Sequence, residues 1–274
     1  MKKILFIITL LILICPVYAA ADRYSEEYLK NKMHFAIMNP IVEHAVQQNI
    51  KKAILKESKG KYKVKFDAYT VASLKQGIFK YLEIIGKDIT FEGYEIPYVN
   101  LKTETDYNWI DYKSEPIIFK SDIVFNSEIH LTEKIINQAL QTTKYKNNLQ
   151  KVNKRAYPLF VINDVRIRIR HDKVHIIMDY NFPIVPMKKN RTFMVSSGFN
   201  IDNGKIKAYN IGIDNAYGNL PIDKVANLVN LLDPLSFTIN LFETKQCDIK
   251  TESITIEDNT VITKGKICIK GDAE

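Results

Sequence analysis

The sequence lacks the short motifs that mark most familiar enzymes. Its 274 residues include only three cysteines and five histidines. It contains no Gly-x-Ser-x-Gly motif, no phosphate-binding glycine loop and no His-Glu-x-x-His motif, so neither a standard nucleophile nor a zinc-dependent hydrolase site is indicated. We therefore expect a protein that is not an enzyme and that uses no metal and no cofactor.

Low-complexity segments are also absent. The composition, with 46% hydrophobic and 26% charged residues, is that of an ordinary globular protein. The chain is long enough to bury a substantial core. We expect residues 20–274 to form a single domain.

The first residues are typical of an export signal. Met1–Lys3 is basic, Ile4–Val17 is almost wholly apolar, and Val17–Ala21 supplies small residues for cleavage. The apolar run is shorter than the roughly 20 residues that a spanning helix needs, which favours cleavage over an uncleaved anchor. The prediction is a signal peptide over residues 1–19, with the mature protein in the periplasm, elsewhere in the cell envelope, or secreted.

The charge balance is moderately basic. The chain has 39 lysines and arginines against 31 acids, and removal of residues 1–19 removes two lysines and leaves an excess of six. This excess favours an anionic membrane surface as a partner, although a merely soluble surface explains it equally well. Nucleic acid is not an expected partner, because the protein is exported and has no basic tract.

Two cysteines lie beyond the signal, Cys247 and Cys268. They flank a predicted hairpin with its turn at 257–259, and a lone pair in an oxidising compartment is often a disulfide. Cys247 shares a strand face with Ile249, whereas Cys268 alternates against Ile267, so a bridge would need a bulge. We predict a Cys247–Cys268 disulfide, with two reduced cysteines as the alternative.

The segment 117–131 has the clearest pattern in the chain. Its odd-numbered positions are mostly apolar and its even-numbered positions mostly polar, as in a strand with one buried face. At roughly 3.3 Å per residue the segment would span about 50 Å, where an ordinary strand has about 5–6 residues. Such a length suits an elongated, strongly twisted sheet that curls around something apolar.

Apolar side chains of the predicted strands are the candidate lipid contacts. Three of them share the inward face of 117–131, and the others lie in the predicted strands 79–91 and 192–201. The six candidates are Phe79, Tyr81, Phe119, Ile123, Phe125 and Phe193. The alternative for each one is a plain core position.

Helical and strand patterns follow one another along the chain. Helical spacing covers residues 25–57 and is split at Asn39–Pro40, where Pro40 fits the first position of a helix. Thr132 is a suitable N-cap for a second helix over 133–142, a polar connector follows at 144–154, and a third helix covers 220–232. The predicted strands are 62–68, 79–91 with a bulge near 84–86, 94–105, 117–131, 160–170, 174–182, 192–201, 205–213, 237–241 and a final hairpin.

Tight turns between successive strands indicate antiparallel pairing. The expected fold class is α+β, with a long, strongly twisted antiparallel sheet that is covered by helices or wrapped around the N-terminal helix.

The best polar constellation is a stripe of arginines. Arg166, Arg168 and Arg170 occupy alternate positions of a predicted strand and therefore share one face. Arginine binds phosphate with two parallel hydrogen bonds, so lipid headgroups are a possible target. A solvated sheet face is the simpler interpretation.

Four features, taken in order, carry a resemblance to a known family. The first is an exported N-terminus that leads into a helix. The second is Leu74–Gly77, a leucine-then-glycine entry into a strand, and the third is Phe91–Pro97, a turn followed by a strand. The fourth is Ile129–Leu140, where a strand leads into a helix through a threonine, an acid, Ile-Asn and a leucine. The chain thereby resembles the LmeA-like family of exported phospholipid-binding proteins over roughly residues 35–270. The resemblance implies a tubular lipid-binding (TULIP-like) architecture, in which a long twisted sheet around a helix holds acyl chains in an apolar groove.

The leading interpretation is an exported envelope protein that binds phospholipid acyl chains in an apolar groove, for lipid transport or envelope maintenance. Two alternatives remain open. One is an envelope enzyme whose site is assembled from distant residues, and the other is a structural or adaptor protein whose sheet is fully packed against itself. An apolar tunnel would separate the lipid-binding interpretation from the second alternative.

Overall fold

The computed structural model describes residues 40–111, 114, 118–156, 161–183, 191–202, 204–214, 222–257 and 259–271. The predicted signal peptide, residues 1–19, lies outside these ranges. The chain divides into two compact units. Unit 1 comprises residues 1–129, 242–250 and 265–274, and unit 2 comprises residues 130–241 and 251–264.

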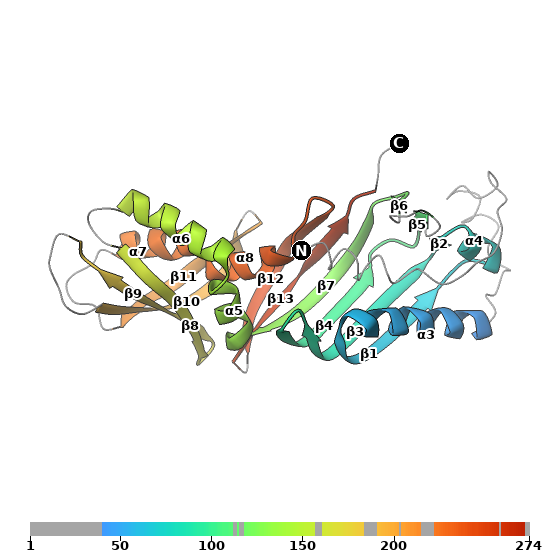
Figure 1. Ribbon diagram of the computed structural model, residues 1–274, viewed down its shortest axis with the longest axis horizontal. Helices are drawn as coiled ribbons and strands as arrows, with labels where there is room; N and C mark the ends of the chain where they lie inside the picture. The colour runs from blue at the N-terminus through green and yellow to red at the C-terminus, as the bar shows by residue number, and fades with distance from the viewer. Residues whose placement is uncertain are drawn as a thin grey trace. The chain divides into compact units, whose positions relative to one another are not determined.

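Unit 1 is built on an antiparallel sheet with a helix at one edge. The sheet has six strands in the order β1-β3-β4-β7-β13-β12, and α3 packs on the edge strand β1 (Figure 1). A smaller sheet has the order β2-β5-β6. The elements that contribute to unit 1 are α3 (Pro40–Glu57), β1 (Lys59–Asp67), α4 (Val71–Lys75), β2 (Ile78–Phe79), β3 (Tyr81–Phe91), β4 (Tyr94–Thr103), β5 (Asn108–Asp111), β6 (Ile118–Phe119), β7 (Ile123–Thr132), β12 (Cys247–Glu257) and β13 (Thr260–Ile269).

Unit 2 contains a second antiparallel sheet, with four strands in the order β11-β10-β9-β8. Helices α5 and α6 pack on the edge strand β8, and α7 and α8 pack on the opposite edge strand β11. Its elements are α5 (Glu133–Leu140), α6 (Thr143–Ala156), β8 (Val161–Arg170), β9 (Lys173–Asn181), β10 (Arg191–Asp202), β11 (Lys205–Asp214), α7 (Ile222–Leu232), α8 (Pro234–Ile239) and the 3₁₀ turn η1 (Asn240–Phe242).

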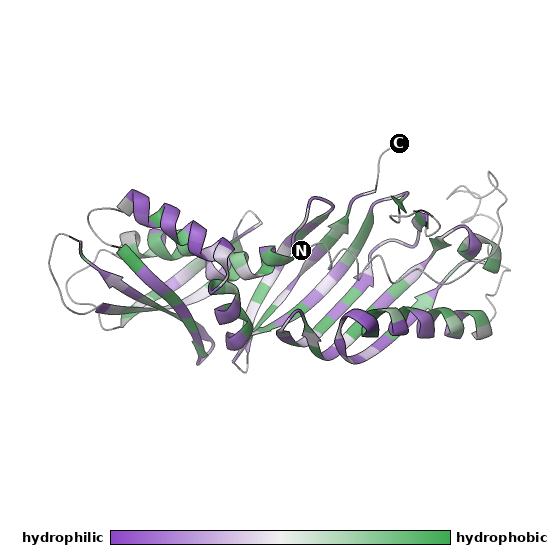
Figure 2. Ribbon diagram, in the orientation of Figure 1, coloured by the Kyte–Doolittle hydropathy of each residue, from purple (hydrophilic) through white to green (hydrophobic). Residues whose placement is uncertain are grey.

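Both sheets show the alternation that the sequence predicts. Hydrophobic and hydrophilic positions alternate along the strands in Figure 2. Val64 and Phe66 of β1 are buried with exposed Lys65 between them, and Ile167 and Ile169 of β8 are buried in the same way. The α+β class and the antiparallel pairing are therefore confirmed.

Local signals predicted several elements correctly. Helix α3 begins at Pro40, and the Thr132 hydroxyl caps α5 by accepting a hydrogen bond from the Ile135 N–H at 3.4 Å. His171 and Asp172, with φ of 50° and 57°, form the two-residue turn between β8 and β9. Positive φ at both central residues is the geometry that matches the twist of a hairpin.

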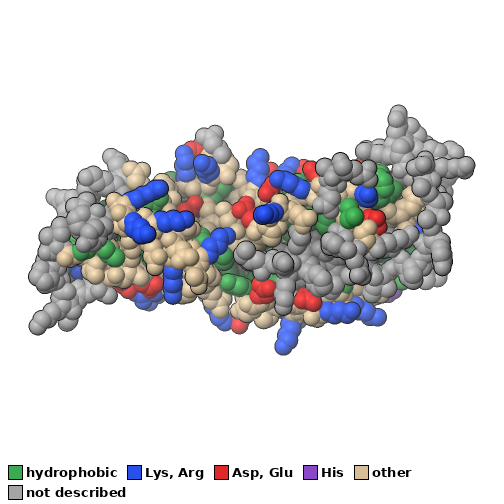
Figure 3. All heavy atoms as spheres, turned by 45° about the horizontal axis from the view of Figure 1, so that its top comes forward, with side chains coloured by type: hydrophobic (Ala, Val, Ile, Leu, Met, Phe, Trp, Pro, Cys, Tyr) green, Lys and Arg blue, Asp and Glu red, His purple; other side chains and the backbone are tan. Residues whose placement is uncertain are grey.

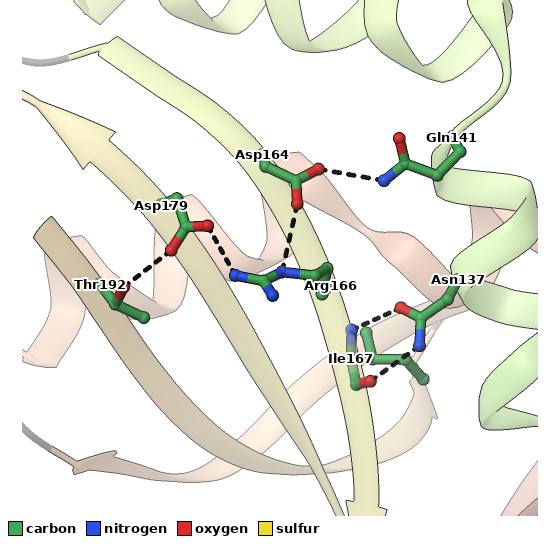
Figure 4. A network of polar contacts seen from close by, with 7 residues as sticks. All are labelled: Asn137, Gln141, Asp164, Arg166, Ile167, Asp179 and Thr192. Carbon is green, nitrogen blue, oxygen red and sulfur yellow. Dashed lines mark hydrogen bonds and ion pairs between the residues drawn. The ribbon is translucent and has the colours of Figure 1, made fainter. Parts of the chain in front are cut away.

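Side-chain amides cover the free edge of β8. The Asn137 side chain of α5 accepts the Ile167 N–H at 2.8 Å and donates to the Ile167 carbonyl at 3.0 Å (Figure 4). Asn153 of α6 makes the same pair of bonds with Ile162, at 2.9 and 2.8 Å. An exposed strand edge is a template for pairing with another chain, so these two residues occupy backbone groups that would otherwise be open.

The prediction of one strand over 117–131 is wrong. The segment is divided between β6 and β7, which belong to different sheets. The N–H groups of Lys120 and Ser121 both donate to the Trp109 carbonyl, at 3.0 and 3.3 Å, and this turns the backbone out of the strand. The facing of the side chains is as predicted, because Ile123 and Phe125 are only 2% and 3% exposed.

The polar connector predicted at 144–154 is instead helix α6. Tyr145, Leu149 and Val152 are buried at a spacing of four and then three residues, which is one narrow apolar stripe. The other faces are so polar that the stripe does not dominate the composition.

The strand predicted at 237–241 is also wrong. Pro234 does not simply end the preceding helix but begins α8. Asp233 adopts a left-handed φ of 32°, and its carboxylate accepts a hydrogen bond from the Ser236 N–H at 3.1 Å. Proline is well suited to the first position of a helix, so Asp233 and Pro234 together restart the helix.

The predicted Cys247–Cys268 disulfide is contradicted, because both cysteines are free. Cys247 is 2% exposed and lies on the inward face of β12. On β13 it is Ile267 and Ile269 that are buried, so the alternation of a strand turns Cys268 toward the opposite face. The parity of the two strands therefore separates the sulfur atoms.

Replacement of the edge-covering amide should destabilise unit 2. Asn137→Ala removes two hydrogen bonds to Ile167, and we expect a loss of about 1–3 kcal/mol in the free energy of unfolding. Urea denaturation followed by circular dichroism measures this, with Asn148→Ala on the exposed face of α6 as the control. Equal stability of the two variants would show that the β8 edge does not depend on Asn137.

Candidate functional site: an apolar cavity in unit 1

An apolar cavity of about 160 Å³ lies in unit 1, at the end of α3 and on one face of the larger sheet. Every one of the six strands contributes at least one lining residue. An engineered apolar cavity of about 150 Å³ stays dry and binds benzene, whereas drug-sized ligands occupy roughly 300–1,000 Å³. The space therefore suits a small apolar group or part of a longer chain.

Paired residues of β3 and β4 form the central wall. The pairs in register that line the cavity are Ile84 with Leu101, Gly86 with Val99, and Ile89 with Ile96. Side chains directly opposite one another on a sheet face are about 4.5–5.5 Å apart at Cβ, so these pairs make a continuous apolar surface. Gly86 has no side chain, and the Tyr62 ring and the Ile89 side chain fill the place that a Cβ atom would take there.

Asp88 allows both halves of β3 to face the cavity. Ile84 and Gly86 lie before it and Ile89 lies after it, so strict alternation would turn Ile89 to the other face. Asp88 has a φ of 53°, and the side chains change face there. The bulge predicted near 84–86 is therefore misplaced, because pairing with β1 and β4 is regular through those residues.

Two hydroxyl groups occur among the described residues that line the cavity, and they are hydrogen-bonded to each other. The Ser58 hydroxyl donates to the Ile54 carbonyl at 2.9 Å, and Ser58 Oγ lies 2.7 Å from Tyr62 Oη. Because the Ser58 proton is already used, Tyr62 is the donor in this second bond. Burial raises the pKa of Tyr62 above its ordinary value.

Cys247 contributes a thiol to the wall. Burial, reinforced by the nearby charge of Asp248, raises the pKa of Cys247 to about 11. The thiolate is the nucleophilic form of cysteine. At neutral pH Cys247 is therefore a small apolar wall residue rather than a reactive group.

The residues predicted to contact lipid lie elsewhere. Phe79, Phe119, Ile123 and Phe125 are all buried core positions of unit 1. Tyr81 is half-buried, with the Lys102 ammonium 5.7 Å from its ring, and Phe193 is a buried residue of β10 in unit 2. The list of the six predicted contacts and the list of cavity-lining residues share no member.

The long alternating segment nevertheless contributes to the cavity through Ile129, a half-buried residue of β7 that lines it. Ile123 and Phe125 share its strand face, as the alternation indicates. The sequence pattern thus identified the face of β7 that lines the cavity, and the residues named from it lie elsewhere on that face. No pattern in the sequence distinguished Tyr62 or Gly86, because the importance of both comes from pairing across strands.

The arginine stripe forms on the exposed side of β8, as predicted. The Arg166 guanidinium lies 3.2 Å from the Asp164 carboxylate and 2.6 Å from the Asp179 carboxylate, and Asp179 also accepts the Thr192 hydroxyl (Figure 4). These acids offset its charge. The stripe belongs to unit 2, and its binding to lipid headgroups remains a prediction.

One apolar stretch in the described part of the chain, Val225–Phe242, has the length and composition of a membrane-spanning helix, with a mean hydropathy of 1.2. It is not one helix, since α7 ends at Leu232 and Asp233 breaks the backbone before α8. Leu235 within it is fully buried. The stretch therefore forms two separate helices, and 39% of its residues are buried.

No group of three or more histidine, cysteine, aspartate or glutamate side chains that could hold a metal ion occurs among the described residues. Comparison with protein families, curated proteins and solved structures found no match to this chain. The function is therefore inferred from the cavity and from the sequence patterns.

The two thiols should react at different rates. Iodoacetamide applied to the native protein at pH 8 should modify half-buried Cys268 first, and Cys247 roughly tenfold more slowly or less, because burial both shields it and keeps it protonated. Peptide mapping by mass spectrometry over time measures both rates. Equal rates would contradict the placement of Cys247. If neither thiol is modified in unfolded, unreduced protein, the two cysteines form a disulfide after all.

Alkaline pH should reveal the buried Tyr62 hydroxyl. Its raised pKa in the folded state means that its contribution to stability is complete below the ordinary tyrosine pKa of about 10 and is lost as the pH rises through the raised value. Tyr62→Phe should therefore make the decline in unfolding free energy above pH 10 less steep. Urea titrations between pH 8 and 11 test this, with Tyr209→Phe, at an exposed position, as the variant that should keep the wild-type slope.

Proposed function

We propose that this chain is an exported envelope protein that binds the acyl chain of a lipid in the unit 1 cavity. The observation that carries the proposal is the lining, which is apolar from all six strands and whose hydroxyl groups are already hydrogen-bonded. A site of this kind offers burial of hydrocarbon and little else. Each buried methylene contributes roughly 0.8 kcal/mol, so a chain of several methylenes needs no polar anchor.

The size of the cavity limits what it holds. At about 160 Å³ it is smaller than the pockets that enclose whole drug-sized ligands. We therefore propose that it takes only part of an acyl chain, with the remainder of the lipid outside it. The TULIP-like arrangement, in which the twisted sheet and α3 enclose the chain, is the corresponding proposal for the fold.

Sequence features support an envelope setting. The apolar leader at residues 1–19 predicts export, and the excess of six basic residues beyond it favours anionic bilayers. Figure 3 shows lysine and arginine side chains scattered over one face of the molecule rather than gathered in a single patch. Such a distribution supports weak, general attraction to an anionic surface.

The cavity also weighs against an adaptor without a ligand. A sheet that is fully packed against itself leaves few voids larger than a water molecule, whereas this cavity has room for a benzene-sized group. The pocket is partly open to solvent, so without a ligand its apolar lining is exposed to water, which is unfavourable. A bound apolar chain would offset that cost.

Lipid should accompany the purified protein and should depend on the cavity wall. Native mass spectrometry of gently purified protein should detect bound phospholipid or fatty acid. Ile129→Asn places an amide in the wall, and desolvation of that group should weaken binding by about 10- to 100-fold, as expected from roughly 1–3 kcal/mol. Ile177→Asn on β9, an equally half-buried strand position of unit 2, is the matched control.

Two results would defeat the proposal. One is a wild-type protein that carries no lipid and extracts none from vesicles of phosphatidylglycerol and phosphatidylethanolamine. The other is a folded Ile129→Asn variant that binds lipid as well as Ile177→Asn does. Near-ultraviolet circular dichroism establishes that both variants are folded.

A further inference from the structure

We infer that Gly86 sets the depth of the cavity, and with it the length of the hydrocarbon end that the protein accepts, methyl group first. This inference rests on the proposed function and names the part of the ligand that the site recognises. The ligand class is an unbranched hydrocarbon chain whose polar end stays outside.

The position of Gly86 gives it this role. It is the cross-strand partner of Tyr62 on β1 and of Val99 on β4, and all three line the cavity. A Cβ atom at position 86 would lie 2.9 Å from Tyr62 Cε1 and 2.6 Å from Ile89 Cδ1. Both distances are shorter than van der Waals contact, so any side chain there must displace the Tyr62 ring and the Ile89 side chain, and both of these line the cavity.

The backbone does not require glycine at this position. Asp88, two residues later, has a positive φ, and so does Gly93 in the following turn, but Gly86 is not among the residues with positive φ. It lies within regular antiparallel pairing with both neighbouring strands. The need for glycine therefore comes from the space above the strand and not from its conformation.

The lining determines which end of the ligand enters. The Tyr62 and Ser58 hydroxyls are used in bonds to each other and to the Ile54 carbonyl, and none of the described residues that line the cavity is charged. A carboxylate or phosphate placed inside would lose its hydration without gaining a partner, which is costly. The methyl end carries no such penalty, so it enters first.

Unit 2 contains a second glycine that is paired with a tyrosine across two strands, and it provides a matched control for substitutions of Gly86. Gly198 of β10 is the cross-strand partner of Tyr209 in unit 2, and a Cβ atom there would lie 2.7 Å from Tyr209 Cζ. Gly198→Ala therefore introduces the same kind of crowding, outside the cavity. If Gly86 served only to seat the Tyr62 ring, the two alanine variants would differ from wild type in stability alone.

Straight-chain primary alcohols of 4 to 12 carbons measure the depth. For the wild type, affinity from calorimetry should rise by about fourfold per carbon, as expected from roughly 0.8 kcal/mol per methylene, until the cavity is full, and then level off. Gly86→Ala should bring the plateau about one carbon earlier and Gly86→Val about three carbons earlier. Val99→Ala, which enlarges the space opposite, should delay it, and Gly198→Ala should leave it unchanged.

Each outcome is decisive. A plateau that moves with the volume at positions 86 and 99 supports the inference. A wild type with a clear plateau that stays in place in folded Gly86→Ala and Val99→Ala overturns the inference and leaves the proposed function standing. A wild type that binds no alcohol of any length overturns both.

Discussion

The row formed by Tyr62, Gly86 and Val99 is the contact on which the rest of the site depends. The tyrosine ring lies over a position with no side chain, and its hydroxyl reaches Ser58 at the end of α3. The three residues are paired across three strands, the Tyr62 hydroxyl joins the sheet to the end of α3, and all three line the cavity. A larger residue at position 86 would displace the Tyr62 ring, because its side chain and the ring would occupy the same volume above the sheet.

Features that depend on residues close together in the sequence could be predicted, and features that depend on distant residues could not. Period-2 alternation and a cap such as Thr132 act within a few residues, and these predictions are confirmed. The break at Lys120 depends on bonds to the distant Trp109, and the face change at Asp88 depends on a single backbone angle. Residues of the cavity are collected from across six strands by register, which no local pattern encodes.

The polar residues of the strand-into-helix segment 129–140 have a structural role. Thr132 caps α5, the Glu133 carboxylate accepts the Ile169 N–H at 3.1 Å, and Asn137 holds both backbone groups of Ile167. This set of polar residues fastens a helix to the edge of a sheet, and it contains none of the cavity-lining residues. The polar pattern at these positions therefore serves to attach α5 to β8 and is independent of a ligand.

The opposed facing of Cys247 and Cys268 also determines how the chain can mature. The end of the β12–β13 hairpin is held by backbone bonds, such as that from the Lys270 N–H to the Gln246 carbonyl at 2.9 Å, and by no covalent link between these strands. Completion of this hairpin requires no oxidant, no disulfide isomerase and no particular thiol balance. Its assembly can therefore proceed at the rate of strand pairing, which is microseconds for a hairpin, rather than at the seconds to hours of disulfide formation.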